Sequence, residues 1–178
     1  MKRRVTRILA IAMTLAAVST AAKAESYVKA QMGITSPDGM DSGTILVLTY
    51  GMPRPDKQNV TYEFEFATTM TEPEEKYTIW GVTTTADLSY STAAGYMVYG
   101  FPFGQKFSTN ARIGLIYESL EVTASNAGAS ASSSETKFGF SFGLGLDYAL
   151  TERTALTVNY TALRSNIDHT TLGIKYTF

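Results

Sequence analysis

Six charged side chains occupy the polar positions of stretches in which apolar and polar residues alternate: Lys29, Glu63, Glu65, Arg112, Asp147 and Lys175. Successive side chains of a β-strand point to opposite faces, so each of these charges lies on the face opposite its apolar neighbours. Buried charges have to pair, because an unpaired one is very costly. We therefore expect Arg112 and Lys175 to be met by Glu63, Glu65 and Asp147 in an ion-paired interior.

A second possible chemistry is acid–base catalysis by the single histidine, His169, which follows Asp168. Thr171 stands two positions on, where a nucleophilic serine would be needed, so the pair is incomplete as a catalytic motif. The sequence has no cysteine, no phosphate-binding loop and no cluster with metal-ligand spacing. We expect no enzyme, no cofactor and no metal site.

The stretch from Lys137 to Tyr148, KFGFSFGLGLDY, indicates which elements position these charges. Its even positions are Phe, Leu or Tyr, and its odd positions are Lys, Gly, Ser or Asp, which is the period of a β-strand. Six large apolar groups are too bulky for the interior of a narrow barrel, whereas glycine and serine suit it. Because outward-facing Phe and Leu are stable only against lipid, the stretch predicts the wall of a transmembrane β-barrel.

The same alternation recurs along the chain and predicts an all-β fold, an eight-stranded antiparallel up-and-down transmembrane β-barrel. The expected strands are 27–35, 44–52, 59–70, 86–99, 109–121, 137–148, one around 156–162, and 168–178. In 86–99 we assign Leu88, Tyr90 and Tyr96 to the lipid face and Asp87 to the interior. The registers of 44–52 and 71–87 stay open. We expect 71–85 to be a loop with a possible hairpin extension, and the low-complexity 125–134 to be a mobile loop.

Aromatic residues near the strand ends predict two girdles at the membrane interfaces. The inner girdle would contain Tyr27, Tyr50, Tyr62, Tyr99, Phe101, Phe103, Tyr148, Tyr176 and Phe178, and the outer one Tyr90, Tyr117, Phe138 and Tyr160. The alternative is a soluble barrel of the lipocalin type with its apolar face around a greasy ligand. That fold would expose the glycines of 137–148 and crowd eight strands of large side chains into one small lumen.

The N-terminal segment has the three parts of an export signal. Basic residues precede an apolar run from Ile8 to Val18, and Ala22-Lys23-Ala24 forms a small-x-small cleavage site. We therefore expect residues 1–24 to be a cleaved signal peptide and 25–178 to be one barrel domain. Five of the 15 Lys and Arg and none of the 16 Asp and Glu lie in 1–24, so the processed chain has a formal net charge of −6. This charge gives no reason to expect nucleic-acid binding.

The chain ends on Phe178, preceded at every second position by Tyr176, Ile174 and Leu172. This row resembles the C-terminal signal by which the barrel-assembly machinery recognises outer-membrane proteins. The processed chain as a whole resembles the small eight-stranded outer-membrane β-barrels of Gram-negative bacteria, the type of the OmpA transmembrane domain and the opacity-like surface proteins. The resemblance implies a location in the cell outer membrane, in contact with its lipid and lipopolysaccharide. Cell-wall tethering is not expected, since no cell-wall-binding domain follows Phe178.

The resemblance implies three functions in descending order. The first is a structural or surface-interaction role, such as adhesion or envelope integrity, in which extracellular loops bind any host or surface ligand. The second is a narrow, gated, porin-like channel. The third is a lipid A-modifying enzyme, whose deacylase type uses a His-x-Ser pair that His169 and Thr171 do not reproduce. Ion conduction, the ligand of the loops and the oligomeric state stay open.

Overall fold

The computed structural model describes residues 25–178 apart from 58, 80–81, 127–128 and 164–165, so the expected signal peptide lies outside the described residues. The described residues form nine strands: β1 (Tyr27–Pro37), β2 (Gly43–Pro53), β3 (Val60–Thr71), β4 (Glu74–Ile79), β5 (Val82–Phe103), β6 (Phe107–Asn126), β7 (Ala129–Ala149), β8 (Thr154–Ala162) and β9 (Ile167–Thr177). In this part of the chain, no helix is long and apolar enough to cross a membrane.

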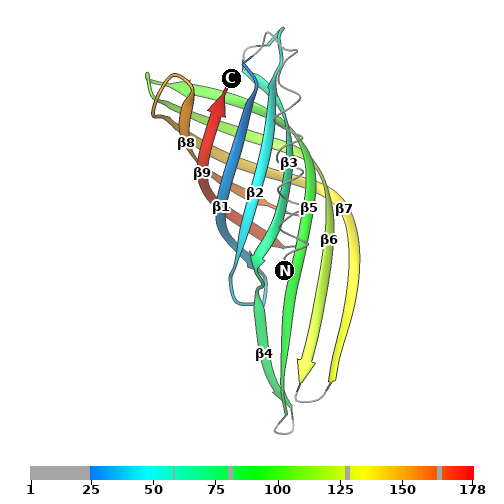
Figure 1. Ribbon diagram of the computed structural model, residues 1–178. Coiled ribbons are helices and arrows are strands. Elements are labelled where there is room, and N and C mark those ends of the chain that lie inside the picture. The colour runs from blue at the N-terminus through cyan, green and yellow to red at the C-terminus, as the bar shows by residue number, and fades with distance from the viewer. Residues whose placement is uncertain (1–24, 58, 80–81, 127–128, 164–165) are drawn as a thin grey trace.

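Eight of these strands close into a ring. All pairings are antiparallel, and the sheet order is β3-β2-β1-β9-β8-β7-β6-β5-β4 with an additional β3–β5 pairing. The β3–β5 pairing closes the order through β5 and leaves β4 outside the ring, where it pairs with β5 and accepts a 3.0 Å hydrogen bond at the Glu74 carbonyl from the Asp41 amide. The start of β1 and the end of β9 lie at the same rim (Figure 1), where the Phe178 amide donates to the Ser26 carbonyl over 3.0 Å. The predicted eight-stranded up-and-down barrel is confirmed.

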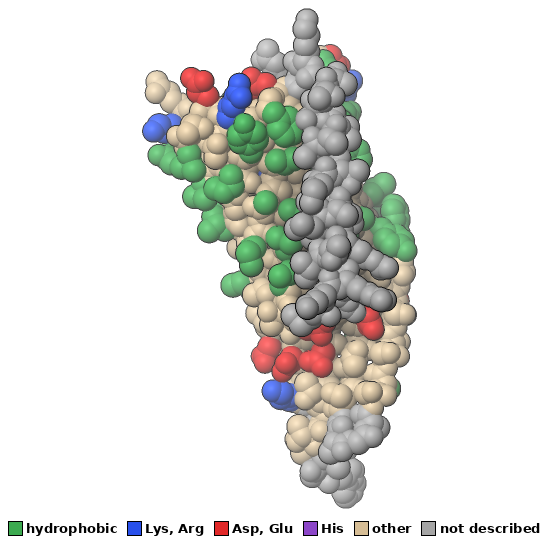
Figure 2. Space-filling view, viewed as in Figure 1, with side chains coloured by type: hydrophobic (Ala, Val, Ile, Leu, Met, Phe, Trp, Pro, Cys, Tyr) green, Lys and Arg blue, Asp and Glu red, His purple; other side chains and the backbone are tan. Residues whose placement is uncertain are grey.

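The two faces of the wall differ as the alternation predicts. On β7, Phe138, Phe140, Phe142 and Leu144 are 60–73% exposed on the outside, whereas Ser141 on the inner face is 1% exposed. Figure 2 shows hydrophobic side chains over the ring and few of them toward the tapered end that carries β4. The apolar rows therefore cover the outer surface of the ring.

The register predicted for 86–99 is wrong. The row that includes Leu88, Tyr90 and Tyr96 is 2–9% exposed and faces the lumen. The opposite row, with Met97 at 51% and Tyr99 at 45%, faces outward. Apolarity misled here because the outer half of the lumen is itself apolar. Asp87 consequently lies on the outward side, but it pairs with Glu74 of β4 beyond the ring, so it does not contact the wall's apolar band.

The girdle assignments of two tyrosines are also wrong. Tyr27 and Tyr90 are 6% and 2% exposed and point into the lumen. Gly51, the partner of Tyr27 across the β1–β2 ladder, leaves room for this ring, because a side chain at Gly51 would collide with it. Tyr99, Phe101 and the other outward aromatics remain available to an interface.

The segment 125–134 is not the predicted loop, since the described part of it continues β6 and β7. The β6–β7 ladder extends through pairs such as Val122–Ser133 and Ala124–Ala131. Short Ser, Thr and Ala side chains permit this continuation because both faces of the strands have left the apolar band, so pairing no longer requires an apolar row. The described part of the expected loop at 125–134 is therefore the outer end of two long strands.

The possible hairpin extension in 71–85 is present as the β4–β5 pair. We call the sheet beyond the ring the flap: β4 together with residues 82–87, 121–126 and 129–136. It rises on one side only, because β5, β6 and β7 have 20 to 22 residues whereas β1, β2, β8 and β9 have 9 to 11 (Figure 1).

Candidate functional site

Arg112 of β6 occupies the centre of the lumen and is 5% exposed. One terminal nitrogen lies 2.5 Å from Glu65 Oε2 and 3.6 Å from Glu63 Oε2, and the other donates to the Thr161 hydroxyl. The guanidinium carbon lies 4.5 Å from the centroid of the Tyr96 ring. Inward positions of β3, β5, β6 and β8 thus converge on one cation, which crosslinks the ring from within.

Glu63 also contacts two side chains of β1, Lys29 and Tyr27. Its Oε1 lies 2.6 Å from Lys29 Nζ and accepts a 2.6 Å hydrogen bond from the Tyr27 hydroxyl. The Lys29 and Glu63 side chains are only 2% and 1% exposed. Lys29, Glu63, Arg112 and Glu65 therefore form one continuous buried group of two cations and two carboxylates.

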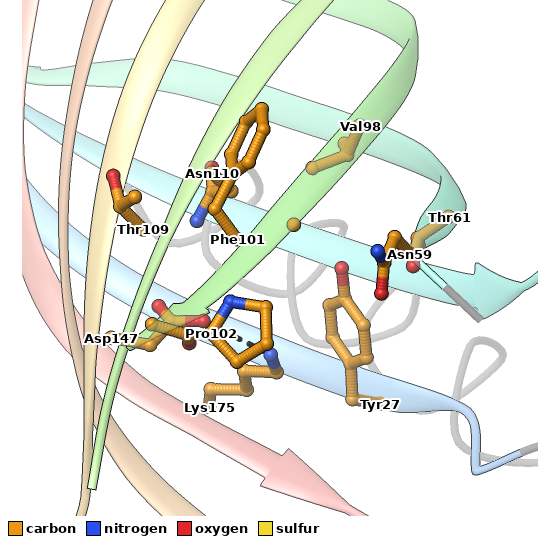
Figure 3. Close-up of a pocket in the computed structure, with 12 residues that line it drawn as sticks. Tyr27, Asn59, Thr61, Val98, Phe101, Pro102, Thr109, Asn110, Asp147 and Lys175 are labelled. Atoms are coloured by element: carbon orange, nitrogen blue, oxygen red, sulfur yellow. Dashed lines mark hydrogen bonds and ion pairs between the residues drawn. The ribbon is translucent and has the colours of Figure 1, made fainter. Parts of the chain in front are cut away.

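The remaining two charges pair nearer the rim with the chain ends. Lys175 Nζ lies 3.0 Å from Asp147 Oδ2 and 4.3 Å from the centroid of the Tyr27 ring. Figure 3 shows this pair beside Tyr27 and Asn110 in a cavity of 210 Å³. Arg112 is not among the residues that line this cavity.

An uncharged network fills the lumen beside the ion pairs. The Asn159 amide donates to Gln31 Oε1 over 3.0 Å, and Gln31 Nε2 donates to the Thr171 hydroxyl over 3.0 Å. These side chains come from β8, β1 and β9 and are 1–4% exposed. Polar contacts thus fill the same half of the ring as the ion pairs.

The outer half of the lumen contains a cluster of apolar side chains together with the buried polar side chains of Thr35, Glu118 and His169. Its buried cluster, with each member at most 9% exposed, includes Ile45, Ala67, Leu88, Ile116, Leu120, Leu163 and Ile167. These residues come from both the tall and the short sides of the ring. A mostly apolar layer therefore lies between the ion pairs around Arg112 and the mouth under the flap.

The Asp168-His169 pair does not form a catalytic dyad. His169 is 2% exposed in the lumen, where Nε2 hydrogen-bonds with the Tyr90 hydroxyl, and that hydroxyl donates to Thr35 Oγ1 over 2.6 Å. Asp168 points to the opposite face and accepts a 2.7 Å hydrogen bond from Tyr160. Strand alternation separates the two neighbours. Within the described ranges, no three His, Asp or Glu side chains form a group that could hold a metal ion.

The flap has two strand edges that the ring does not cover. The β7–β8 ladder ends at the Phe142–Ala162 pair, so 129–136 of β7 has no partner on that side among the described residues. Among the described strands β4 pairs with β5 alone, and its other edge accepts one hydrogen bond, from the Asp41 amide to the Glu74 carbonyl. The C-terminal row lies elsewhere, on the outer surface of the ring, where Leu172, Ile174, Tyr176 and Phe178 are 39–53% exposed.

Sequence reasoning missed several residues that contact the ion pairs, chiefly Tyr27, Tyr96, Thr161 and Thr49, whose hydroxyl donates to Glu65 over 3.3 Å. The sequence could have indicated Thr49 and Thr161, because the alternation of each strand places these residues on the face that points into the lumen. Nothing in the sequence pairs Tyr96 with Arg112, since the two lie on neighbouring strands at positions offset by the ladder register.

The sequence profile of the family described as "Outer membrane protein beta-barrel domain" matches residues 8–178. The chain belongs to this outer-membrane β-barrel family. The barrel is therefore an integral outer-membrane protein. In such barrels the longer loops are usually extracellular and the shorter turns periplasmic.

Solved structures share the barrel's fold at low sequence identity. Ail, the attachment invasion locus protein of Yersinia pestis, is 16% identical with a TM-score of 0.55, covering 88% of this chain and 100% of its own. Neisserial surface protein A is 15% identical with a TM-score of 0.61, covering 86% and 97%. OprG from Pseudomonas aeruginosa is 18% identical with a TM-score of 0.55, covering 88% and 97%. No curated protein matches the sequence of this chain.

Proposed function

We propose that this barrel is a non-enzymatic surface-interaction protein, in which the ring anchors the flap in the outer membrane and the flap contacts partners outside the cell. One observation carries the proposal: three strands continue as a paired sheet past a ring whose lumen is filled. A transport role would need a path through the ring, whereas a contact role needs a rigid projection from it.

The filled lumen favours contact over transport. The group around Arg112 spans the ring from β1 to β8, and the apolar layer lies above it. An eight-stranded barrel is only wide enough for side chains to fill. We propose that Lys29, Glu63, Glu65, Arg112, Asp147 and Lys175 form a permanent plug, and that a gated channel is the second candidate.

The free edges of the flap support a protein partner. The unpaired N–H and C=O groups along 129–136 and along β4 beyond Glu74 can accept an extended segment as an additional strand. The negative charge at the flap end of the barrel favours a segment that is positively charged. Its described residues include the carboxylates of Asp38, Asp41, Glu72, Glu74, Glu75, Asp87, Glu121, Glu135 and Asp168, against only Lys76 and Lys137.

The same charge argues against a sulfated glycan. Ail has been solved in complex with the heparin analogue sucrose octasulfate, a polyanion. A polyanion would meet repulsion at the acidic end of this barrel, so the ligand of that protein is not carried over here.

Cells that display the barrel provide the test. The variant replaces residues 124–131 with Asn-Gly, which joins Thr123 to its ladder partner Ser132 by a two-residue hairpin turn and keeps the β6–β7 register. This variant shortens the 129–136 edge but keeps β4 and the carboxylates of this end. We expect the truncated barrel to adhere more weakly than the full barrel to surfaces coated with a cationic protein, and neither form to adhere to heparin. Equal adhesion by the two forms would reject the outer part of the flap as the contact surface.

The absence of enzyme activity is tested separately. We expect overexpression of the barrel to leave the lipid A mass spectrum unchanged, because His169 and Asp168 lie on opposite faces of β9. A mass change that disappears in His169→Ala would instead establish the enzyme.

We further propose that residues 1–24 are removed on export and that Leu172, Ile174, Tyr176 and Phe178 form the assembly signal. The outward exposure of the four side chains supports accessibility to the assembly machinery. Intact-mass measurement should give a chain beginning at Glu25. Phe178→Ser should lower the assembled fraction, whereas Thr177→Ser on the other face should not.

A further inference from the structure

A cleft of 420 Å³ opens at the extracellular mouth of the barrel, on the inner side of the flap. Its tall wall is formed by inward-facing residues of β5, β6 and β7, among them Leu88, Val122 and Glu135. Its low rim is formed by the β1–β2 turn, with Asp38 and Met40, and by the start of β9. The difference in strand height creates the cleft, because a wall rises on one side only.

The cleft is apolar at its base and closed beneath. Leu88, Leu120 and Ile167 line it and also belong to the buried cluster that fills the outer lumen. Val122, one layer further out, is 40% exposed. A molecule can therefore rest its apolar part on this surface but meets packed side chains below it. The volume falls within the roughly 300–1,000 Å³ of small-molecule sites.

The charged groups of the lining favour a cation. Lys137 lies in the wall with its Nζ 3.1 Å from Glu135 Oε2, so this lysine is already paired. Asp38 on the opposite rim adds a further carboxylate. We propose that the cleft binds a small amphipathic cation, a molecule with an apolar body and one protonated amine. The apolar body lies against Leu88, Leu120 and Val122, and the amine lies between the carboxylates of Asp38 and Glu135.

The test uses two fluorescent probes of similar size and opposite charge. Dansylcadaverine carries an ammonium group at pH 7, and anilinonaphthalene sulfonate carries a sulfonate. Each is titrated into the full barrel in nanodiscs of zwitterionic lipid, and the signal of empty nanodiscs is subtracted. We expect saturable binding of the cation with a Kd at least about tenfold lower than that of the anion, equivalent to about 1.4 kcal/mol.

Matched variants on the two faces of the flap locate the binding. Val122→Lys places a cation inside the cleft, and Thr123→Lys places the same charge on the same strand but on the opposite face. Val122→Lys should abolish binding of the cationic probe, and Thr123→Lys should not. Glu135→Gln should weaken binding several-fold, whereas Glu121→Gln on the outer face should leave it unchanged.

Three results would overturn the proposal: equal affinity for the two probes, equal losses in Val122→Lys and Thr123→Lys, or no saturable binding above empty nanodiscs. Heat-modifiable gel migration of each variant checks that its ring has assembled, and Thr123→Lys controls for a general effect of charge on the flap. The adhesion assay is independent of these titrations, so failure of the cleft leaves the contact role of the flap edges standing.

Discussion

The two halves of β7 lie in one continuous ladder with β6 but are built from different residues. From Phe138 to Leu146 the outward row is apolar and 42–73% exposed, whereas the flap half, 129–136, consists of Ala, Ser, Thr and Glu. Strand pairing continues across the boundary, while the outward row changes from apolar to polar. The length of a strand therefore follows from its pairing with the neighbouring strand. The polarity of its outward side chains follows from whether lipid or water surrounds them.

The ring and the flap also differ in their ion pairs. In the ring, Arg112 and Glu65 have side chains that are each 3% exposed. At the base of the flap, Glu135 and the adjacent Lys137 have side chains that are 65% and 41% exposed. Water and salt screen the second pair but hardly reach the first. Removing one partner should therefore destabilise the barrel much more in the buried pair than in the exposed pair.

The largest expected effect comes from breaking the ring's pair. Arg112→Ala leaves Glu65 buried without its cation and should lower the free energy of unfolding by about 3 to 5 kcal/mol. Lys137→Ala, which breaks the flap pair, should change it by no more than about 1 kcal/mol. Urea titration of the barrel in lipid vesicles measures both. Equal losses would show that burial does not distinguish the two pairs.

The next effect tests the outward face at two heights on one strand. Phe142→Lys places a charge against the middle of the apolar band and should cost about 2 to 4 kcal/mol in the same titration. Ser132→Lys has the same outward parity but lies in the flap, where water solvates the charge, and should cost almost nothing. A large loss in Ser132→Lys would mean that the apolar band extends into the flap.

The smallest expected effect is that of removing the outer part of the flap. Replacing 124–131 with Asn-Gly should leave heat-modifiable gel migration intact and shift the urea midpoint less than Phe142→Lys does. The ring keeps its lumen contacts and its β3–β5 closure in this variant. A barrel that no longer assembles after truncation would make the flap part of the folding unit rather than a projection from it.

The alternation of apolar and polar residues was sufficient to predict which face of a ring strand points into the lumen wherever the two faces differ in polarity. The stretches that contain Lys29, Glu63, Arg112 and Asp147 each place a charge inward and apolar groups outward, and the structure has these faces. The prediction of a closed eight-stranded barrel followed from such strands, because a charge on the wrong face near the bilayer centre is costly.

Alternation failed in β5 because its inward row is as apolar as its outward row. Leu88 packs in a mostly apolar outer lumen formed with Ile45 and Ile116, and the hydrophobicity of β5 alone does not reveal those neighbours. One signal was available. Met97 shares parity with the girdle residues Tyr99, Phe101 and Phe103 at the end of the same strand, and this continuous row would have set the register.

The flap escaped prediction for a different reason. Serine and alanine in 125–134 carry no apolar period, and pairing between β6 and β7 depends on a ladder that begins far down in the ring. The contacts among the lumen charges depend on the stagger of neighbouring strands, which no single strand specifies. Composition and parity thus predict which side chains enter the lumen, but not which of them meet.

The central claim is that the lumen is filled and that the barrel acts through contacts made by the flap. Planar-bilayer recording of the purified barrel tests this claim most directly. The account predicts a silent bilayer for the wild-type protein, because the ion pairs around Arg112 and the apolar layer above them occupy the lumen. Discrete conductance steps in the wild-type protein that change in Arg112→Ala would contradict it, since they would show that this group gates an open path.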